Sequence, residues 1–106
     1  MSRGSEYLRA EIDLATSGTH LVIPAASMPG RRVFIHQIVL WPWDAVTVVY
    51  LDESTTINGA GFNLQGAGHG AHVLEGEPLL QVTSFSISLS DNVAVTGWVT
   101  YRLGYG

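Results

Sequence analysis

Strict alternation of serine with large apolar residues at positions 84–90 is the feature that most constrains the fold of this chain. Phe85, Ile87 and Leu89 fall on one side of an extended strand and the serines fall on the other, because successive side chains of a strand point to opposite faces. A helix would spread the same residues around its circumference. The segment therefore predicts a β-strand with one buried face.

A second alternating segment follows at residues 93–103, where Val95 and Val99 lie on one face and Trp98 lies among polar residues on the other. An Asp-Asn pair separates the two segments and is typical of a tight turn. We therefore expect residues 84–103 to form a hairpin.

The rest of the chain repeats this pattern in short stretches that are separated by Gly, Pro and Asn. Residues 31–41 are apolar on both faces, which is typical of a central strand covered on both sides, so we expect Trp41 to lie in the core. Helical periodicity is nearly absent. About eight short strands at this spacing predict an all-β fold, an antiparallel β-sandwich or a jelly roll.

The domain organisation is simple, because the 106 residues contain no linker and no internal repeat. We expect a single β-sandwich domain over residues 11–106. Residues 1–10 are polar and predict an N-terminal arm that orders only on binding.

Charge is sparse, since 13% of the residues are charged, 46% are hydrophobic and the net charge is −4. Five arginines among nine acidic residues do not form the dense basic surface that nucleic acid requires. Because interface cores are depleted in charged residues, the composition favours self-association or docking on a partner. We expect no nucleic-acid partner.

The chain has no cysteine, which excludes disulfides and thiolate metal sites. Its first residues lack the apolar core of a signal peptide, and the apolar run at residues 38–43 is too short to cross a membrane. We therefore expect no membrane partner and synthesis in the cytoplasm.

His69 and His72, followed by Glu75 and Glu77, form the best candidate for a metal site or a catalytic site. Zinc sites usually hold their histidines on a regular element, whereas this pair lies in a Gly-rich stretch, so two solvated loop histidines are the favoured interpretation. No nucleophile elbow, P-loop or dinucleotide fingerprint is present. The sequence predicts no enzyme, no cofactor and no metal, with a metal-dependent cupin-like enzyme as an open alternative.

Aromatic residues and arginines at exposed positions are the usual composition of a protein–protein hot spot. Trp98 shares the polar face of its segment with Arg102, and the N-terminal arm adds two further arginines. A carbohydrate site that uses Trp43 or Trp98 stays open, because exposed aromatic rings also stack on sugars. The candidate interface residues are Arg3, Tyr7, Arg9, Trp43, Trp98 and Arg102.

From Ile12 to Arg102, the order of segments and turns resembles that of small jelly-roll-like structural proteins of tailed phages and prophages. The resemblance is carried by HLVIPA at 20–25, GRRVFI at 30–35, VTVVY at 46–50, GEPL at 76–79, FSISL at 85–89 and VTGWVTYR at 95–102.

This resemblance implies a capsid decoration, or cement, protein that binds the major capsid protein as a homotrimer and reinforces the phage head. It implies a location on the capsid surface of the virion after assembly in the host cytoplasm, and no catalytic residues. The Trp-Pro-Trp stretch at 41–43 and the His-containing loop depart from plainer members of the family. They leave a carbohydrate- or receptor-binding module of a phage tail as the alternative.

Overall fold

The strands of the protein pair in a nested order, the first with the last. The computed structural model describes residues 7–25, 30–53, 55–66 and 71–105. Within these residues the strands are β1 (Leu8–Leu14), β2 (Gly18–Ile23), β3 (Arg31–Pro42), β4 (Val46–Asp52), β5 (Thr55–Leu64), β6 (His72–Val82), β7 (Phe85–Leu89) and β8 (Val95–Tyr105).

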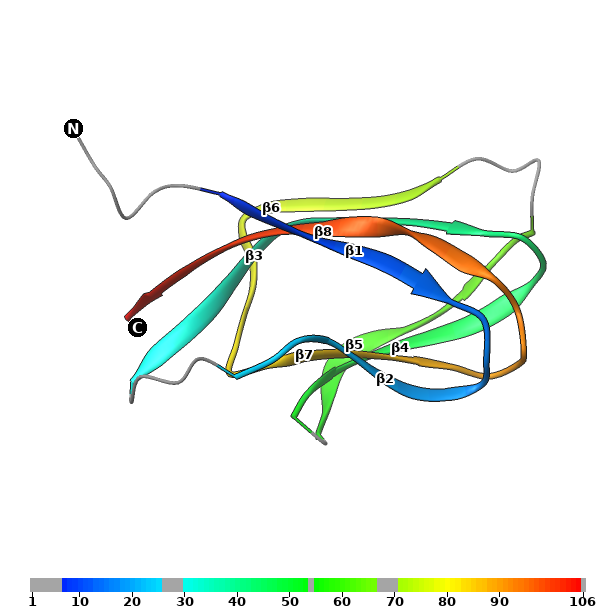
Figure 1. The fold of residues 1–106 in the computed structure, drawn as a ribbon, viewed down its shortest axis with the longest axis horizontal. Helices are drawn as coiled ribbons and strands as arrows, with labels where there is room; N and C mark the ends of the chain where they lie inside the picture. The colour runs from blue at the N-terminus through cyan, green and yellow to red at the C-terminus, as the bar shows by residue number, and fades with distance from the viewer. Residues whose placement is uncertain (1–6, 26–29, 54, 67–70, 106) are drawn as a thin grey trace.

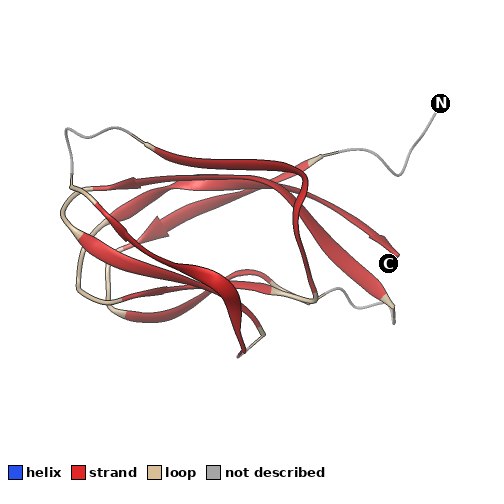
Figure 2. Cartoon of the chain, turned by 180° about the vertical axis from the view of Figure 1, so that it is seen from behind, coloured by secondary structure: helices blue, strands red, loops and turns tan. Residues whose placement is uncertain are grey.

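Two four-stranded antiparallel sheets, ordered β1-β8-β3-β6 and β2-β7-β4-β5, lie one over the other (Figures 1 and 2). The pairs β1–β8, β2–β7, β3–β6 and β4–β5 join opposite halves of the chain. This nested pairing is the strand arrangement of a jelly roll. The predicted antiparallel β-sandwich is therefore confirmed.

The predicted hairpin over residues 84–103 is wrong. β7 pairs with β2 and β4, whereas β8 pairs with β1 and β3, so the chain passes from one sheet to the other between them. Figure 1 shows this connection in orange at the right-hand end of the molecule. A strand buries one face whether it continues a hairpin or crosses to the other sheet, so alternation alone does not distinguish the two.

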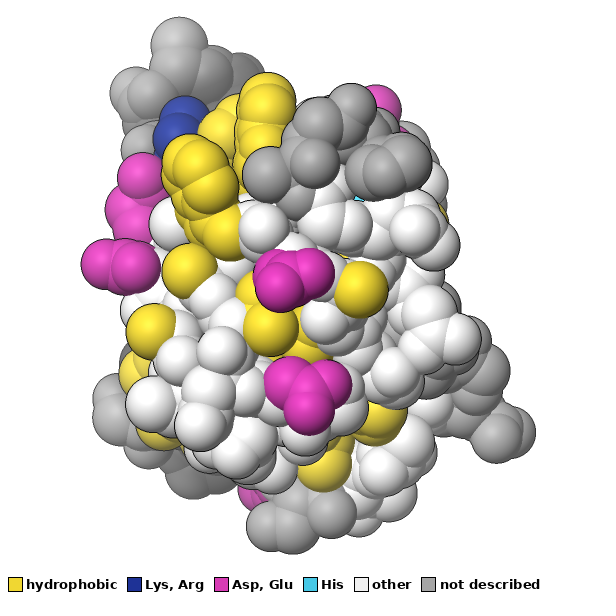
Figure 3. All heavy atoms as spheres, turned by 90° about the vertical axis from the view of Figure 1, so that its right-hand side faces the viewer, with side chains coloured by type: hydrophobic (Ala, Val, Ile, Leu, Met, Phe, Trp, Pro, Cys, Tyr) yellow, Lys and Arg dark blue, Asp and Glu magenta, His cyan; other side chains and the backbone are white. Residues whose placement is uncertain are grey.

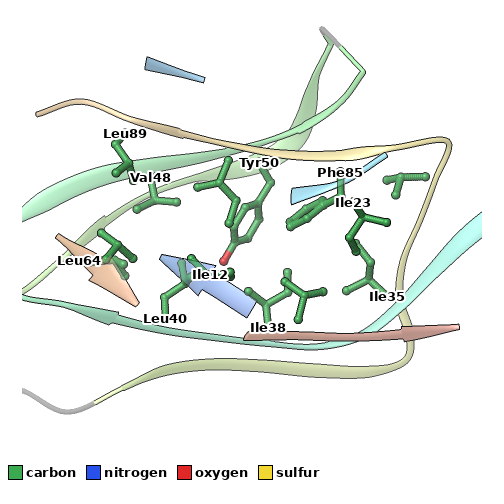
Figure 4. Close-up of a cluster of buried hydrophobic side chains, with 14 of the residues drawn as sticks. Ile12, Ile23, Ile35, Ile38, Leu40, Val48, Tyr50, Leu64, Phe85 and Leu89 are labelled. Carbon is green, nitrogen blue, oxygen red and sulfur yellow. The ribbon is translucent and has the colours of Figure 1, made fainter. Parts of the chain in front are cut away.

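The core fills the space between the two sheets, and Phe85, Ile87 and Leu89 point into it as predicted. Tyr50 comes from β4, and its ring lies 5.2 Å from that of Phe85, measured between centroids. Figure 4 shows the Tyr50 hydroxyl pointing across the core toward the opposite sheet. Burial raises the pKa of Tyr50 well above its ordinary value, so this residue stays neutral inside the core.

β3 runs in the middle of its sheet, as predicted, but a β-bulge at His36 interrupts its alternation. Ile35 pairs with Tyr101 and Gln37 pairs with Thr100, which leaves His36 as an extra residue between them. One extra residue exchanges the two faces of every position beyond it.

Trp41 shows the consequence of this exchange, and the prediction that it lies in the core is wrong. Beyond the bulge, Ile38 and Leu40 are the residues that point inward and are fully buried. Trp41 points outward and is 47% exposed.

β1 begins at Leu8 and pairs this residue with Tyr101 of β8. The sheet therefore starts before the boundary at residue 11 that the sequence predicts between arm and domain. Residues 1–6 of the predicted arm, including Arg3, lie outside the described residues.

Gly97 allows β8 to lie close against β3. Its φ is +147°, and an added Cβ would lie 1.9 Å from the carbonyl oxygen of Val39. Gly18 has a φ of +101°, but no atom outside its chain neighbours lies within 4 Å of the position of its Cβ. The two glycines therefore separate the effect of backbone strain from the effect of crowding.

We expect Gly97→Ala to lower the free energy of unfolding by at least about 3 kcal/mol, because strain and overpacking add at this position. Gly18→Ala carries the strain alone and is expected to cost about 1 kcal/mol. Urea denaturation of both variants measures the difference. Equal losses in the two variants would show that the close approach to Val39 is unimportant.

Candidate functional site

Cross-strand register arranges the outer face of the β1-β8-β3-β6 sheet in rows that run across the strands. In one row, Arg9 pairs with Thr100, Thr100 with Gln37, and Gln37 with Glu75. Neighbouring strands lie about 4.8 Å apart, so these side chains stand next to one another. We call these four residues the polar row.

The next row along the strands begins with Glu11 on β1 and continues with the apolar residues Trp98, Val39 and Val73. Val39 points outward but is only 5% exposed, so its neighbours on this face cover it. Trp41 follows Val39 on the same side of β3. Figure 3 looks at the end of the molecule where β3 leaves the sheet, and it shows hydrophobic side chains gathered beside a basic one.

Arginines cover two aromatic rings of this face. The guanidinium carbon of Arg9 lies 4.2 Å from the ring centroid of Trp98, and that of Arg102 lies 4.3 Å from the ring centroid of Phe34. Nε of Arg9 also donates to Oε2 of Glu11 over 2.8 Å. Both arginines therefore pack on their own sheet through cation–π contacts.

Gln37 is held in one orientation by Trp98. The indole N–H of Trp98 donates to Oε1 of Gln37 over 3.1 Å. Because an indole nitrogen only donates, this contact requires the amide oxygen to face Trp98, and the NH₂ group faces elsewhere.

A pocket of about 480 Å³ opens on this face and is lined by Tyr7, His36, Gln37, Glu75, Gly76 and Thr100. Three of these residues, Gln37, Glu75 and Thr100, belong to the polar row. His36 is 8% exposed, and its ring lies edge-on to that of Tyr7 with the centroids 4.8 Å apart.

Irregular pairing on two adjacent strands creates the pocket. Residues 76–79 of β6 lie between the partners of Gln37 and Ile35, whereas β3 has only His36 between the same two positions. β6 therefore bends away from the ladder here. At the bend, an added Cβ on Gly76 would lie 2.8 Å from Cα of Leu79, so the turn is tight.

The structure places several of the predicted interface residues on this one face. Arg9, Trp98 and Arg102 point outward from the sheet, and Tyr7 lines the pocket. Trp43 lies apart in the turn after β3, where it is 60% exposed and its backbone N–H donates to the carbonyl oxygen of Ala94 over 2.9 Å. The N-terminal candidate Arg3 is not among the described residues.

Sequence reasoning missed Gln37 and Thr100, and it considered Glu75 only as part of the candidate metal site. The three come from different strands, and only the pairing register brings them together. The bulge at His36 also decides that Gln37 points outward, and no local pattern signals that bulge.

The candidate metal residues do not form one site in the described part of the chain. His69 lies outside it, and His72 pairs with Leu40 on the inward side of β6, whereas Glu75 belongs to the outward polar row. Among the described residues, no three His, Asp or Glu side chains come together in a way that would hold a metal ion. Burial lowers the pKa of His72.

Neither protein-family models nor curated proteins match this chain. No helix that is long and apolar enough to span a membrane occurs in the described residues.

We expect the free energy of unfolding to fall as the pH is lowered from about 7 to about 5. The pKa of His72 is lowered in the folded state. Below the ordinary histidine pKa of about 6.5, the unfolded chain therefore binds a proton at His72 more readily than the folded protein does. The free energy of unfolding therefore has its full value above that pKa and declines as the pH falls below it. His72→Gln is expected to flatten the decline, as measured by urea midpoints at several pH values, and an unchanged slope would contradict the role of His72.

Proposed function

We propose that the protein is a structural virion protein rather than an enzyme, namely a capsid decoration protein that binds the outer surface of a phage head and stabilises it. The resemblance in segment order along the chain supports this role. The jelly-roll strand order is compatible with it, because viral capsid proteins use this fold, as do lectins and cupins. The main observation in support of the proposal is the pair of exposed tryptophans at the end of β3.

Trp41 and Trp43 flank Pro42, at the point where β3 ends and the chain turns toward β4. They are 47% and 60% exposed in a chain with only 13% charged residues. Burying a large apolar side chain contributes about 1.5–3 kcal/mol, and tryptophan is enriched at interface hot spots. This end of the molecule is therefore the proposed contact with the major capsid protein.

The proposed assembly is a homotrimer. A symmetric oligomer places several copies of the same contact on a repeating shell at once. Because each further contact forms within an already bound complex, modest affinity for each subunit gives stable attachment.

Particles that lack the protein test this role. Inactivating its gene is expected to give heads that lose infectivity at lower temperature and under milder osmotic shock than normal particles, and added purified protein is expected to restore resistance. Equal resistance of both kinds of particle, together with no binding of the purified protein, would overturn the proposal.

Variants test the proposed contact on the same particles. Trp41→Ser combined with Trp43→Ser is expected to weaken binding by at least about tenfold, as loss of two anchoring aromatics does at other interfaces. Leu21→Ser is the matched control, because Leu21 is an exposed apolar residue on β2 of the other sheet. Equal weakening in both variants would contradict a specific contact at the end of β3.

The same two tryptophans favour a second candidate, a carbohydrate- or receptor-binding module of a phage tail. Immunogold labelling of intact particles separates the two roles. Label on heads supports decoration, and label confined to tails supports the receptor-binding module.

A further inference from the structure

The pocket beside the polar row is large enough for a small molecule. Its volume of about 480 Å³ lies within the range of about 300–1,000 Å³ that is typical of such sites. Gln37, Glu75 and Thr100 lie at paired positions of the sheet, which favours a fixed geometry for these three over that of a loop. Neither the decoration role nor the tryptophans at the end of β3 account for this pocket.

The hydrogen-bonding groups of the pocket restrict the ligand. Gln37 presents an NH₂ group, because its oxygen accepts from Trp98, and the Glu75 carboxylate stands on the neighbouring strand. On the other side of Gln37, the hydroxyl of Thr100 both donates and accepts. Donors and acceptors therefore alternate across the strands.

This alternation favours hydroxyl groups on the ligand. A cation would be bound by acceptors alone, and an anion by donors alone. A ligand that accepts from Gln37 and donates to Glu75 needs an acceptor and a donor at adjacent positions, and vicinal hydroxyls supply both.

The remaining walls of the pocket favour a ring-shaped ligand with apolar faces. Tyr7 is 53% exposed and stands edge-on to the buried imidazole of His36. A pyranose carries hydroxyls around its rim and C–H groups on its faces, so its rim meets the polar row while a face meets an aromatic side chain.

Residues that do not line the pocket also fix the orientation of Gln37 within it. Glu11 binds Arg9, Arg9 covers Trp98, and Trp98 donates to Gln37. This chain of contacts fixes the one pocket residue whose amide could otherwise present either end. Fixing it before binding reduces the entropy that the ligand must overcome.

We propose that this pocket binds a pyranose sugar through Gln37, Glu75 and Thr100. The site is distinct from the tryptophans at the end of β3, and the inference holds whether the protein lies on a phage head or on a tail. Sugar binding would give the protein a ligand in addition to its partner in the virion.

Titration of the full chain with methyl glycosides of glucose, galactose, mannose and N-acetylglucosamine tests the proposal by amide NMR. At least one sugar is expected to shift the signals of Gln37, Glu75, Thr100 and the Trp98 indole saturably, with a Kd on the order of 1 mM. The proposal is overturned if none shifts these signals at about 50 mM, or if the shifts centre on Trp41 and Trp43.

Substitutions in the pocket complete the test. Glu75→Gln and Thr100→Val keep the size of each side chain, and each is expected to weaken binding by about tenfold through loss of one hydrogen-bonding group. Leu21→Ser, at an exposed position on β2 of the other sheet, is the control and is expected to leave the affinity unchanged. Unchanged affinity in both pocket variants would overturn the proposal, and it would leave the virion role standing, since that role is tested on particles.

A second titration distinguishes a polysaccharide from a single terminal sugar as the source of the ligand. Maltotetraose and cellotetraose are compared with methyl glucoside. Tighter binding of a tetrasaccharide assigns the ligand to a polysaccharide that continues along the sheet, whereas equal binding assigns it to a single terminal sugar.

Discussion

The pairing of β3 with β8 is the interaction on which the rest of the structure depends. It joins the two inner strands of one sheet, and the outer strands β1 and β6 attach to it on either side. Its close approach at Gly97 leaves no room for a side chain next to the carbonyl of Val39. The bulge at His36 then decides which residues of β3 enter the core and which form the outer face.

Much of the fold could be predicted from the sequence, because burial imposes a period of two on each strand. The strand at residues 84–90 follows from that period, whereas the central position of β3 follows from its apolar residues on both faces. Two features could not be predicted. The crossing between β7 and β8 has the same alternation as a hairpin, and the bulge at His36 moves Trp41 from the core to the surface without any local signal.

The candidate site could be predicted only in part, for a related reason. Aromatic residues and arginines are residue types enriched at interfaces, so Trp98, Arg9 and Tyr7 could be predicted as candidates from their type alone. Gln37, Thr100 and Glu75 are ordinary polar residues in isolation. They become a site only because the register sets them in one row and the bulge turns Gln37 outward.

The irregular pairing of β6 has two effects: it opens the pocket, and it protects this edge of the sheet from pairing with another molecule. β6 is an edge strand, and an edge with free backbone groups invites pairing with another sheet. The bend at residues 76–79, which includes Pro78, interrupts that edge. The same bend opens the pocket over His36. Arg9 and Arg102 lie over aromatic rings of the adjoining face and reduce its apolar surface. Contacts through side chains, at the tryptophans and in the pocket, are therefore favoured over strand addition along β6.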